Sequence, residues 1–274
     1  MPRPIRPRDD KRPFDLIADV HGCIDELRAL LGLLGYSLDG DVLRHPAGRR
    51  VVFLGDMVDR GPDTPGVLRI AMASEAAGTS FSVIGNHDDK LRRALIGRPV
   101  QVTHGLAESL AQLFDAKESF RQAIVRFIED MPSHLILDRG RLLAAHAGLP
   151  RKYHGREDAK ARDIAMFGPT TGLTDMDGLP VRINWAADYK GPPAVVYGHT
   201  PVVEPVWQND TIDLDTGCVF GHRLTALRWP EHDLVSVPAQ RTYVVKSGPF
   251  RLIGPGGAKA DGVASATKGT GGNG

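Results

Sequence analysis

The chain has 274 residues, and its 34 lysine and arginine residues balance 33 aspartate and glutamate residues to a formal net charge of +1. The length is sufficient for one large domain with a substantial core, whereas the balanced charge excludes a global field that would recruit nucleic acid or a membrane surface. The two cysteines, Cys23 and Cys218, form no closely spaced framework, which favours a reducing compartment. No signal peptide or membrane span is recognisable, so the sequence predicts a cytoplasmic protein without a membrane partner.

In the first part of the chain, short apolar runs typical of buried strands alternate with segments of helical spacing. Val51 to Leu54 is the clearest buried strand, and Ile24 to Leu34 is the clearest helix, with Gly35 as a natural stop. The expected elements are strands over 14–20, 51–54 and 79–84, a hairpin over 36–50 with its turn at 39–40, and helices over 24–34 and from Asp63 or Thr64 to Ala77.

A mostly helical insertion is expected at about 91–131, and it either covers the pocket or flanks the sheet. Its helical runs are expected over 91–96, 106–114 and 120–128, with Thr103 as a cap. The later elements are expected to be a hairpin over 134–145, a helix near 157–167, a strand over 194–197, and strands over 202–206, 211–214, 223–229 and 234–237 that form a second sheet. The roles of residues 151–193 stay unassigned.

The two ends of the chain differ in composition from the rest. Residues 1–12 are rich in proline and arginine and are expected to form a disordered basic arm. Residues 247–274 are dominated by glycine, alanine and lysine without apolar periodicity, which predicts a disordered tail. A single domain over 13–246 remains. Its repeated strands, each ending in a polar cluster, predict an α/β fold with a shared site at one sheet edge.

The polar residues at the ends of the apolar runs have carboxylate, imidazole and amide side chains, and glycines stand beside them. They are Asp19, His21, Asp56, Asn86, His146 and His199. This set suits two divalent cations, with manganese as the first choice and iron, zinc or nickel as alternatives. One cation would take Asp19, His21 and Asp56, and the other would take Asn86, His146 and His199, with Asp56 shared. A shared carboxylate can hold two cations about 3.5 to 4 Å apart, which would allow a bridging hydroxide to attack phosphorus.

Three further residues near the candidate ligands fit the remaining steps of phosphoester cleavage. Arg60 can clamp a phosphate oxygen, with Asn86 as a second substrate contact. His87 can protonate the leaving oxygen if Asp59 holds its tautomer. Taken one at a time, these residues could equally be structural. The charged turn at 55–61 could be a solvated ion pair, and a lone histidine is more often hydrogen-bonded than a ligand.

Five short segments occur in a fixed order between Phe14 and Val245: DVHG, GDMVDRG, GNHD, HAG and GHT. Together they resemble the signature of the calcineurin-like metallophosphoesterases, in particular the phosphoprotein-phosphatase branch. The resemblance implies an αββα sandwich, in which two facing mixed β-sheets are flanked by helices, with a helical cover insertion. It also implies a binuclear metal site with the ligand roles given above.

The C-terminal half carries a closer resemblance. The segments over 185–202 and 212–231 look like the phosphatase module of bacterial polynucleotide kinase-phosphatase and the asymmetric bis(5'-nucleosyl)-tetraphosphatases. In that subgroup the acid of the DTGC motif, here Asp215, is counted with the active site, where it would position a ligand or a water. The alternative is a turn carboxylate that caps Gly217. His222 stands where the subgroup commonly has a glycine, and no P-loop motif is present, so healing of nucleic-acid ends would require a partner.

These features predict a metal-dependent phosphoesterase that cleaves phosphomonoesters, including nucleotide or cyclic-nucleotide phosphates. The alternatives are a serine/threonine protein phosphatase acting on phosphoproteins, a bis(5'-nucleosyl)-tetraphosphatase, and a non-catalytic binding scaffold. The scaffold is disfavoured because Arg60 and His87 are both present, although binding alone does not need them.

Overall fold

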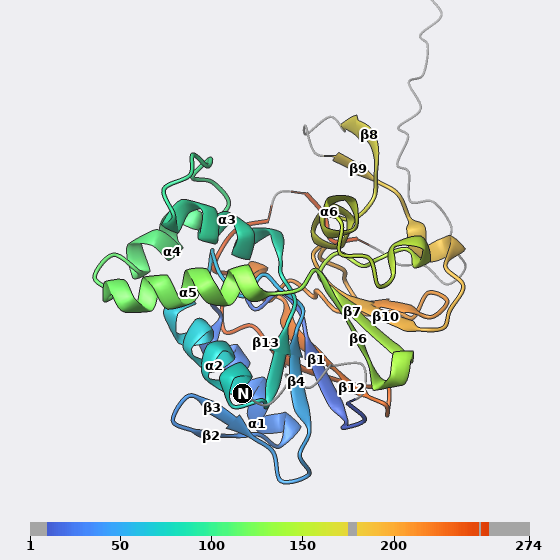
Figure 1. The fold of residues 1–274 in the computed structure, drawn as a ribbon, viewed down its shortest axis with the longest axis horizontal. Helices are drawn as coiled ribbons and strands as arrows, with labels where there is room; N and C mark the ends of the chain where they lie inside the picture. The colour runs from blue at the N-terminus through green and yellow to red at the C-terminus, as the bar shows by residue number, and fades with distance from the viewer. Residues whose placement is uncertain (1–9, 175–179, 247, 252–274) are drawn as a thin grey trace, which may run out of the picture.

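A computed structural model describes residues 10–174, 180–246 and 248–251, and in this part of the chain two β-sheets lie face to face between helices (Figure 1). The strands are β1 (Phe14–Ile17), β2 (Ser37–Asp39), β3 (Val42–Arg44), β4 (Arg50–Phe53), β5 (Ser80–Ser82), β6 (His134–Leu137), β7 (Leu142–Ala145), β8 (Thr170–Thr174), β9 (Pro180–Arg182), β10 (Ala194–Tyr197), β11 (Thr211–Asp213), β12 (Arg223–Trp229) and β13 (Asp233–Pro238). The helices are α1 (Ile24–Leu34), α2 (Thr64–Ala76), α3 (Asn86–Leu95), α4 (Leu106–Gln112), α5 (Glu118–Asp130) and α6 (Ala159–Phe167). The predicted sandwich of two mixed sheets flanked by helices is confirmed.

Alternation along the strands explains why the layers stack. In β4, Val51 and Phe53 belong to the core under the helices, whereas Val52 belongs to the core between the sheets. In β7, Leu142 faces the core between the sheets and Leu143 faces the outer core beside α6. Successive strand side chains point to opposite faces, so a strand that is apolar throughout must be covered on both. Each large apolar side chain buried in this way contributes about 1.5–3 kcal/mol relative to full exposure.

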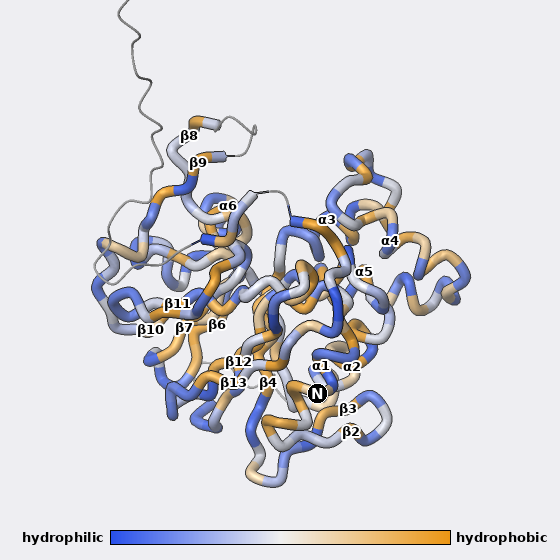
Figure 2. Tube along the Cα trace, turned by 180° about the vertical axis from the view of Figure 1, so that it is seen from behind, coloured by the Kyte–Doolittle hydropathy of each residue, from blue (hydrophilic) through white to orange (hydrophobic). Residues whose placement is uncertain are grey.

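The helices divide between the two outer faces. Leu27 of α1 and Val67 of α2 pack in the same core as Val51, so these helices cover the five-stranded sheet. Ile164 of α6 packs with Leu143, so α6 covers the four-stranded sheet (Figure 1). Figure 2 shows that the hydrophobic segments gather in the strands, with hydrophilic segments mostly on the surrounding loops. Among the described residues, no helix is both long and apolar enough to cross a membrane.

The order of the strands places several loops at a common edge. The five-stranded sheet has the order β13-β12-β1-β4-β5, and the four-stranded sheet has the order β11-β10-β7-β6. In the first sheet β1, β4 and β5 are parallel neighbours, and in the second β7, β10 and β11 are parallel neighbours. The carboxyl ends of parallel strands lie at one edge, so each sheet presents three loops there.

The predicted strand groupings need two corrections. The strands expected over 211–237 do not form one second sheet, because β11 runs parallel to β10 while β12 and β13 add an antiparallel edge to β1. The strand expected over 202–206 is wrong as well, since only Val202 forms a bridge, to Arg251. Pro201 precedes this segment and Pro205 lies within it, and a proline cannot donate a hydrogen bond to a ladder.

The helical predictions were right in outline and wrong in detail. The insertion contains α3, α4 and α5, but α3 begins at Asn86, so the polar GNHDD cluster is itself the start of a helix. The N-cap of α4 is Gly105 and not Thr103. Of the two caps considered for α2, Asp63 is the one used, because its side chain accepts a hydrogen bond from Gly66 N. The unassigned region contains the exposed strands β8 and β9, which pair antiparallel.

Most of the predicted basic arm and glycine-rich tail falls on residues 1–9, 247 and 252–274, which lie outside the described residues. The described parts of these segments contact the domain. Asp10 is buried and forms an ion pair with Arg50 at 2.6 Å. Arg251 N donates a hydrogen bond to Pro201 O at 2.8 Å. The boundaries at residues 12 and 247 therefore stay predictions, but contacts with the domain extend beyond both of them.

Candidate functional site

The loops that follow the parallel strands carry the site, and several of their residues have left-handed backbone conformations. The φ angles of Asp19, His21, Asp56 and His199 are 42°, 45°, 48° and 77°. Such angles are uncommon outside glycine and cluster at functional sites, where the surrounding structure holds them. A Cβ atom at Gly85 would collide with the Asp56 carboxylate, so glycine is required for the close approach of the β4 and β5 loops.

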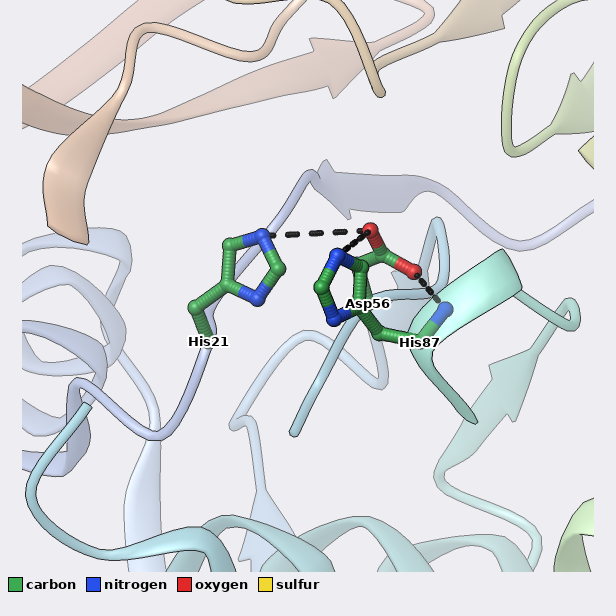
Figure 3. Close-up of side chains that lie close together, drawn as sticks. All are labelled: His21, Asp56 and His87. Carbon is green, nitrogen blue, oxygen red and sulfur yellow. Dashed lines mark hydrogen bonds and ion pairs between the residues drawn. The ribbon is translucent and has the colours of Figure 1, made fainter. Parts of the chain in front are cut away.

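His21, Asp56 and His87 form a buried group that we call the first group (Figure 3). The Nδ1 atom of His21 donates to Val58 O at 2.8 Å, which turns Nε2 toward Asp56 Oδ2 at 3.8 Å. The backbone N–H of His87 donates to Asp56 Oδ1 at 2.9 Å, and its ring Nε2 lies 3.9 Å from Oδ2. The Arg60 Nη1 atom lies 2.6 Å from His21 Nε2. The loops after β1, β4 and β5 therefore meet at one carboxylate.

Asp56, His146 and His199 form the second group, which shares Asp56 with the first. The Nδ1 atom of His146 donates to Leu54 O at 2.9 Å, so Nε2 faces the site. This Nε2 lies 3.0 Å from Asn86 Oδ1, 3.0 Å from His199 Nδ1 and 3.4 Å from Asp56 Oδ1. Four potential ligand atoms thus converge from the loops of both sheets. The other ring nitrogen of His199, Nε2, is buried and has no hydrogen-bond partner within the described chain.

Asp19 and Asp215 lie at the side of the site formed by the four-stranded sheet. Both carboxylate oxygens of Asp19 accept the backbone N–H of His199, each at 3.1 Å. Asp215 Oδ1 accepts the backbone N–H of Gly217 at 2.9 Å, so the turn interpretation of this acid is correct. Asp215 is also close enough to Asp19 for its charge to raise the pKa of that carboxyl. The two sequence-based interpretations of Asp215 are therefore compatible.

Hydrogen bonds that involve Asp59 and Ser109 fix the orientation of the His87 ring. Its Nδ1 atom lies 2.6 Å from Asp59 Oδ2, and both side chains are buried. The Ser109 hydroxyl donates to Asp59 Oδ1 at 2.7 Å and accepts the backbone N–H of Asp59 at 2.9 Å. Because a carboxylate at Nδ1 fixes the tautomer of an imidazole, Nε2 of His87 is the atom left to exchange a proton at the site.

Burial and neighbouring charges set the pKa values of the candidate ligands. Burial lowers the pKa of His21 well below its usual value, and the charge of Arg60 lowers it further. Burial also lowers the pKa of His199, with a further contribution from His146. Both rings are therefore neutral at pH 7 and keep a lone pair for a cation. Burial alone would raise the pKa of Asp56, but the charge of His146 holds it well below its usual value, so this carboxylate stays ionised.

The acids at the edge of the four-stranded sheet crowd one another. Burial raises the pKa of Asp19 well above its usual value, and the charges of Asp215 and Asp56 raise it further. Burial raises the pKa of Asp215 to about 6. Burial and the charge of Asp215 raise the pKa of Asp213 as well. Like charges this close disfavour ionisation unless positive charge is added between them. The donor set thus fits divalent cations, because these would supply that charge.

The sequence did not reveal the role of Asp88, which holds the backbone around Asp56 in place. Asp88 is fully buried and accepts three backbone N–H groups, from Asp56 at 2.8 Å, Gly85 at 3.0 Å and Met57 at 3.1 Å. Burial, together with the charge of Asp56, raises its pKa to about 7. Asp88 was visible in the GNHDD cluster, but only its position in the first turn of α3 shows what it binds.

The helical insertion also contributes groups that the sequence did not reveal. From α4, Gln112 accepts the Thr64 N–H at 2.7 Å and donates to Gly61 O at 2.9 Å. The insertion therefore braces the turn that carries Asp59 and Arg60. Beside this turn lies a pocket of about 360 Å³, lined by Arg60, Gly61, Pro62, Glu108, Gln112, Arg241, Thr242 and Tyr243.

His104 and His222 lie outside both groups, and their surroundings differ. Burial lowers the pKa of His104, and the charges of Lys90 and Arg60 lower it further, so His104 lies close to the site. His222 donates from Nδ1 to Thr216 O at 2.8 Å, so it supports the loop that carries Asp215.

Comparisons with known proteins agree with this geometry. Residues 12–234 match the family model described as calcineurin-like phosphoesterase. Bis(5'-nucleosyl)-tetraphosphatase PrpE (asymmetrical) from Anoxybacillus flavithermus is 44% identical over 242 residues, which cover 86% of this chain and 99% of the relative. The protein of the same name from Bacillus subtilis is 44% identical over 234 residues, covering 84% of this chain and 96% of the relative.

Solved structures with the same fold include a candidate diadenosine tetraphosphatase, with a TM-score of 0.60, 23% identity, and coverage of 84% of this chain and 95% of that chain. A protein serine/threonine phosphatase from Saccharomyces cerevisiae has a TM-score of 0.57, 12% identity, and coverage of 88% of this chain and 82% of that chain. At these identities the likeness is one of fold alone.

Proposed function

Because the chain belongs to the calcineurin-like phosphoesterase family and is therefore a hydrolase of phosphoester bonds, we propose that it is a binuclear enzyme that cleaves dinucleoside tetraphosphates asymmetrically. The tetraphosphatase was one of the alternatives from the sequence, and the relatives named above favour it over a general phosphomonoesterase. The observation that carries the proposal is the convergence of Asn86, His199 and Asp56 on Nε2 of His146.

The proposed cation sites share Asp56, as the two groups do, but the first site takes Asp19 in place of His87, which is kept for proton transfer. Asp19, His21 and Asp56 would hold one cation, and Asp56, Asn86, His146 and His199 would hold the other. All of these donors are nitrogen or oxygen, which suits manganese, iron or zinc, and we propose manganese. When bound, a pair of divalent cations supplies positive charge at the phosphate and makes a water molecule nucleophilic.

Arg60 is the proposed phosphate clamp. Its guanidinium now lies 2.6 Å from Nε2 of His21, where a cation would bind. Two positive groups repel at that separation, so we expect Arg60 to turn toward the substrate when the cation is present. Its side chain lies over the Phe220 ring at 5.2 Å, and it also lines the 360 Å³ pocket. Arg60 can therefore contact a phosphate between the site and the pocket with its planar fork.

His87 is the proposed proton donor. The Asp59 carboxylate holds Nδ1, so Nε2 can give a proton to the oxygen that leaves phosphorus. Ser109 keeps Asp59 in place and so extends this unit into the helical insertion.

The pocket beside Arg60 is the proposed site for the part of the substrate that does not react. A dinucleoside tetraphosphate extends beyond the phosphorus that is attacked, and its remaining phosphates are negatively charged. Arg60 and Arg241 bring two cations to the pocket, and Arg241 is held over the Tyr243 ring at 4.9 Å. Glu108 also lines the pocket, so the two arginines leave it with a net positive charge, which fits a polyphosphate chain better than an apolar lining would. We also propose that the enzyme is cytoplasmic, because nucleotides are abundant in that compartment.

The experiment is a substrate panel with the metal-free protein reloaded with Mn²⁺. The panel holds diadenosine tetraphosphate, 3'-AMP, 2',3'-cyclic AMP, an RNA 3'-phosphate end and a phosphopeptide. We expect the highest kcat/KM for diadenosine tetraphosphate, with AMP and ATP as the products. Two molecules of ADP would contradict asymmetric cleavage. A higher kcat/KM for any other substrate on the panel would contradict the substrate assignment.

A further inference from the structure

The two cysteines of the chain meet in the core together with a glutamate. Cys23 and Glu26 lie three residues apart at the start of α1, so they share one face of the helix. Cys218 comes from the short 3₁₀ turn Cys218–Phe220, far along the sequence. Their side chains are 0%, 1% and 2% exposed for Cys23, Glu26 and Cys218. One carboxylate oxygen and the two sulfurs all lie within 4.8 Å of one another.

One oxygen of this glutamate lacks a partner. Glu26 Oε1 accepts the backbone N–H of Gln240 at 2.9 Å and the hydroxyl of Tyr243 at 2.8 Å. Its second oxygen, Oε2, is buried without a hydrogen bond in the described part of the chain. Burying a carboxylate oxygen without a partner is costly. Neither lysine nor arginine forms an ion pair with Glu26 among the described residues, so a positive charge is missing here.

The donor chemistry differs from that of the catalytic site. The catalytic groups offer only nitrogen and oxygen, whereas this cluster offers two sulfurs and one oxygen. Thiolate sulfur selects zinc and similar thiophilic cations, and zinc also accepts a carboxylate in the same coordination sphere. A disulfide between the cysteines would leave the carboxylate oxygen without a role. The third donor therefore favours a cation over a disulfide.

We propose that Cys23, Glu26 and Cys218 form a binding site for a thiophilic divalent cation such as Zn²⁺, separate from the catalytic centre. The site joins the start of α1, two residues after His21, to the turn that follows Asp215. The Cys23 thiol lies 3.8 Å from the backbone oxygen of His21, directly behind the first group. A bound cation would tie the loop of the five-stranded sheet to the loop of the four-stranded sheet.

The cation can reach this site through the segment that covers it. Residues 240–242 are exposed and belong to neither a helix nor a strand. Gln240 and the adjoining Tyr243 hold this segment over Glu26 through the hydrogen bonds given above. Local opening of such a segment requires few contacts to break. Binding would release the two thiol protons to solvent and place two thiolates and one carboxylate around the cation.

The test uses the reduced, metal-free, full-length protein and Co²⁺ as a spectroscopic probe. Cobalt bound by thiolates gives a charge-transfer band in the near ultraviolet, which the nitrogen and oxygen donors of the catalytic site do not give. We expect this band in the wild-type protein, its loss on addition of excess Zn²⁺, and its absence in Cys23→Ser and Cys218→Ser. We expect zinc analysis to find one fewer ion per chain in either variant than in the wild type.

A third variant, Glu26→Gln, distinguishes a lost ligand from a misfolded protein. Glu26→Gln keeps both sulfurs, so we expect it to retain the cobalt band but to require a higher Co²⁺ concentration. Circular dichroism checks that each variant is folded. A reduced wild-type protein without the band, or a Cys218→Ser protein with the band unchanged, would overturn the proposal. None of these measurements depends on the phosphoesterase substrate, so failure here and failure of the proposed function are distinguishable.

Discussion

The two groups of the site share Asp56, but they differ in the strands that carry their histidines and in what they leave unpaired. The first group lies on the loops after β1, β4 and β5 of the five-stranded sheet, whereas the second joins Asp56 to His146 and His199, which follow β7 and β10 of the four-stranded sheet. In the first group the Nδ1 atoms of both histidines have partners, Val58 O for His21 and the Asp59 carboxylate for His87. In the second group Nε2 of His199 has no partner among the described residues.

This difference indicates a division of labour between the groups. In the proposed mechanism, the first group binds phosphate and moves a proton, because Arg60 lies beside it and a carboxylate holds its His87 imidazole. The second group has a buried imidazole nitrogen without a partner among the described residues, and Asp19 beside His199 adds a crowded acid, so we expect this side of the site to depend more on added positive charge. The site is therefore two unlike halves joined by one carboxylate.

Replacing Asp56 should have the largest effect, because both proposed cation sites then lose a ligand. We expect Asp56→Asn to lower kcat/KM for diadenosine tetraphosphate by more than the roughly 10²–10³-fold typical of losing one positioned charge-stabilising group. Metal analysis should show fewer Mn²⁺ ions per chain. The control is Asp25→Asn, an exposed acid in the first turn of α1. Wild-type turnover and metal content in Asp56→Asn would refute the shared role.

The second prediction separates proton transfer from cation binding. We expect His87→Ala to lower turnover of 3'-AMP, which has a poor leaving group, by about 10²–10⁴-fold, and to change turnover of an activated aryl phosphate far less. Asp59→Asn should act in the same direction with a smaller effect, because Ser109 still contacts residue 59. Rates with the two substrates decide the matter, and equal losses on both would remove His87 from the role of proton donor.

The third prediction concerns Asp88, which holds the backbone around Asp56 and is not a proposed substrate contact. Asp88→Asn removes charge from a side chain that binds three backbone N–H groups around Asp56. We expect a loss of about 10–100-fold in the apparent affinity for Mn²⁺, as is typical when a group that orients ligands is altered. The measurement is the Mn²⁺ concentration that gives half-maximal activity.

The neighbouring acid offers a matched control for this substitution. Asp89→Asn changes the next residue of α3, whose carboxylate pairs with Arg92 at 2.9 Å near the surface. We expect little change in the Mn²⁺ requirement, because an i,i+3 pair on one helix contributes only about 0.2–0.5 kcal/mol. Similar shifts in both variants would mean that Asp88 acts only through the general stability of α3.

The smallest effect on activity is expected at Glu75, which flanks the five-stranded sheet far from both halves. Burial raises its pKa from 4.5 to about 7. The bound proton therefore stabilises the fold fully below pH 4.5, and this contribution is lost as the pH rises through about 7. Because Gln mimics the protonated acid, Glu75→Gln should raise Tm by about 2–4 °C at pH 8 and leave it unchanged below pH 4.5. An equal shift at both pH values would contradict the assignment.

Much of the fold could be predicted because the signals were local. The apolar run over 51–54 and the helical spacing over 24–34 correspond to β4 and α1, and Gly35 ends α1 with a φ of 92°. The partners of β11, β12 and β13 could not be predicted in the same way. Their alternation specifies a strand with a buried face, but it does not specify which sheet will bury it.

The site shows the same division. The candidate ligands could be found because each follows an apolar run beside a glycine, which is a pattern visible along the chain. Asp88, Ser109 and Arg241 could not be found, since their roles depend on atoms brought close by the packing of α3, α4 and the segment after β13. No periodicity marks such contacts.

By itself, the sequence determined which side chains are available for chemistry and that they stand at strand ends, because residue type and local pattern suffice for both. Only the tertiary structure decided that His87 lies in one group with His21 and Asp56, that Arg60 contacts His21, and that Cys23 lies beside Cys218. Distances between residues far apart in the chain are set by how the two sheets pack. That packing depends on the whole core rather than on any one segment.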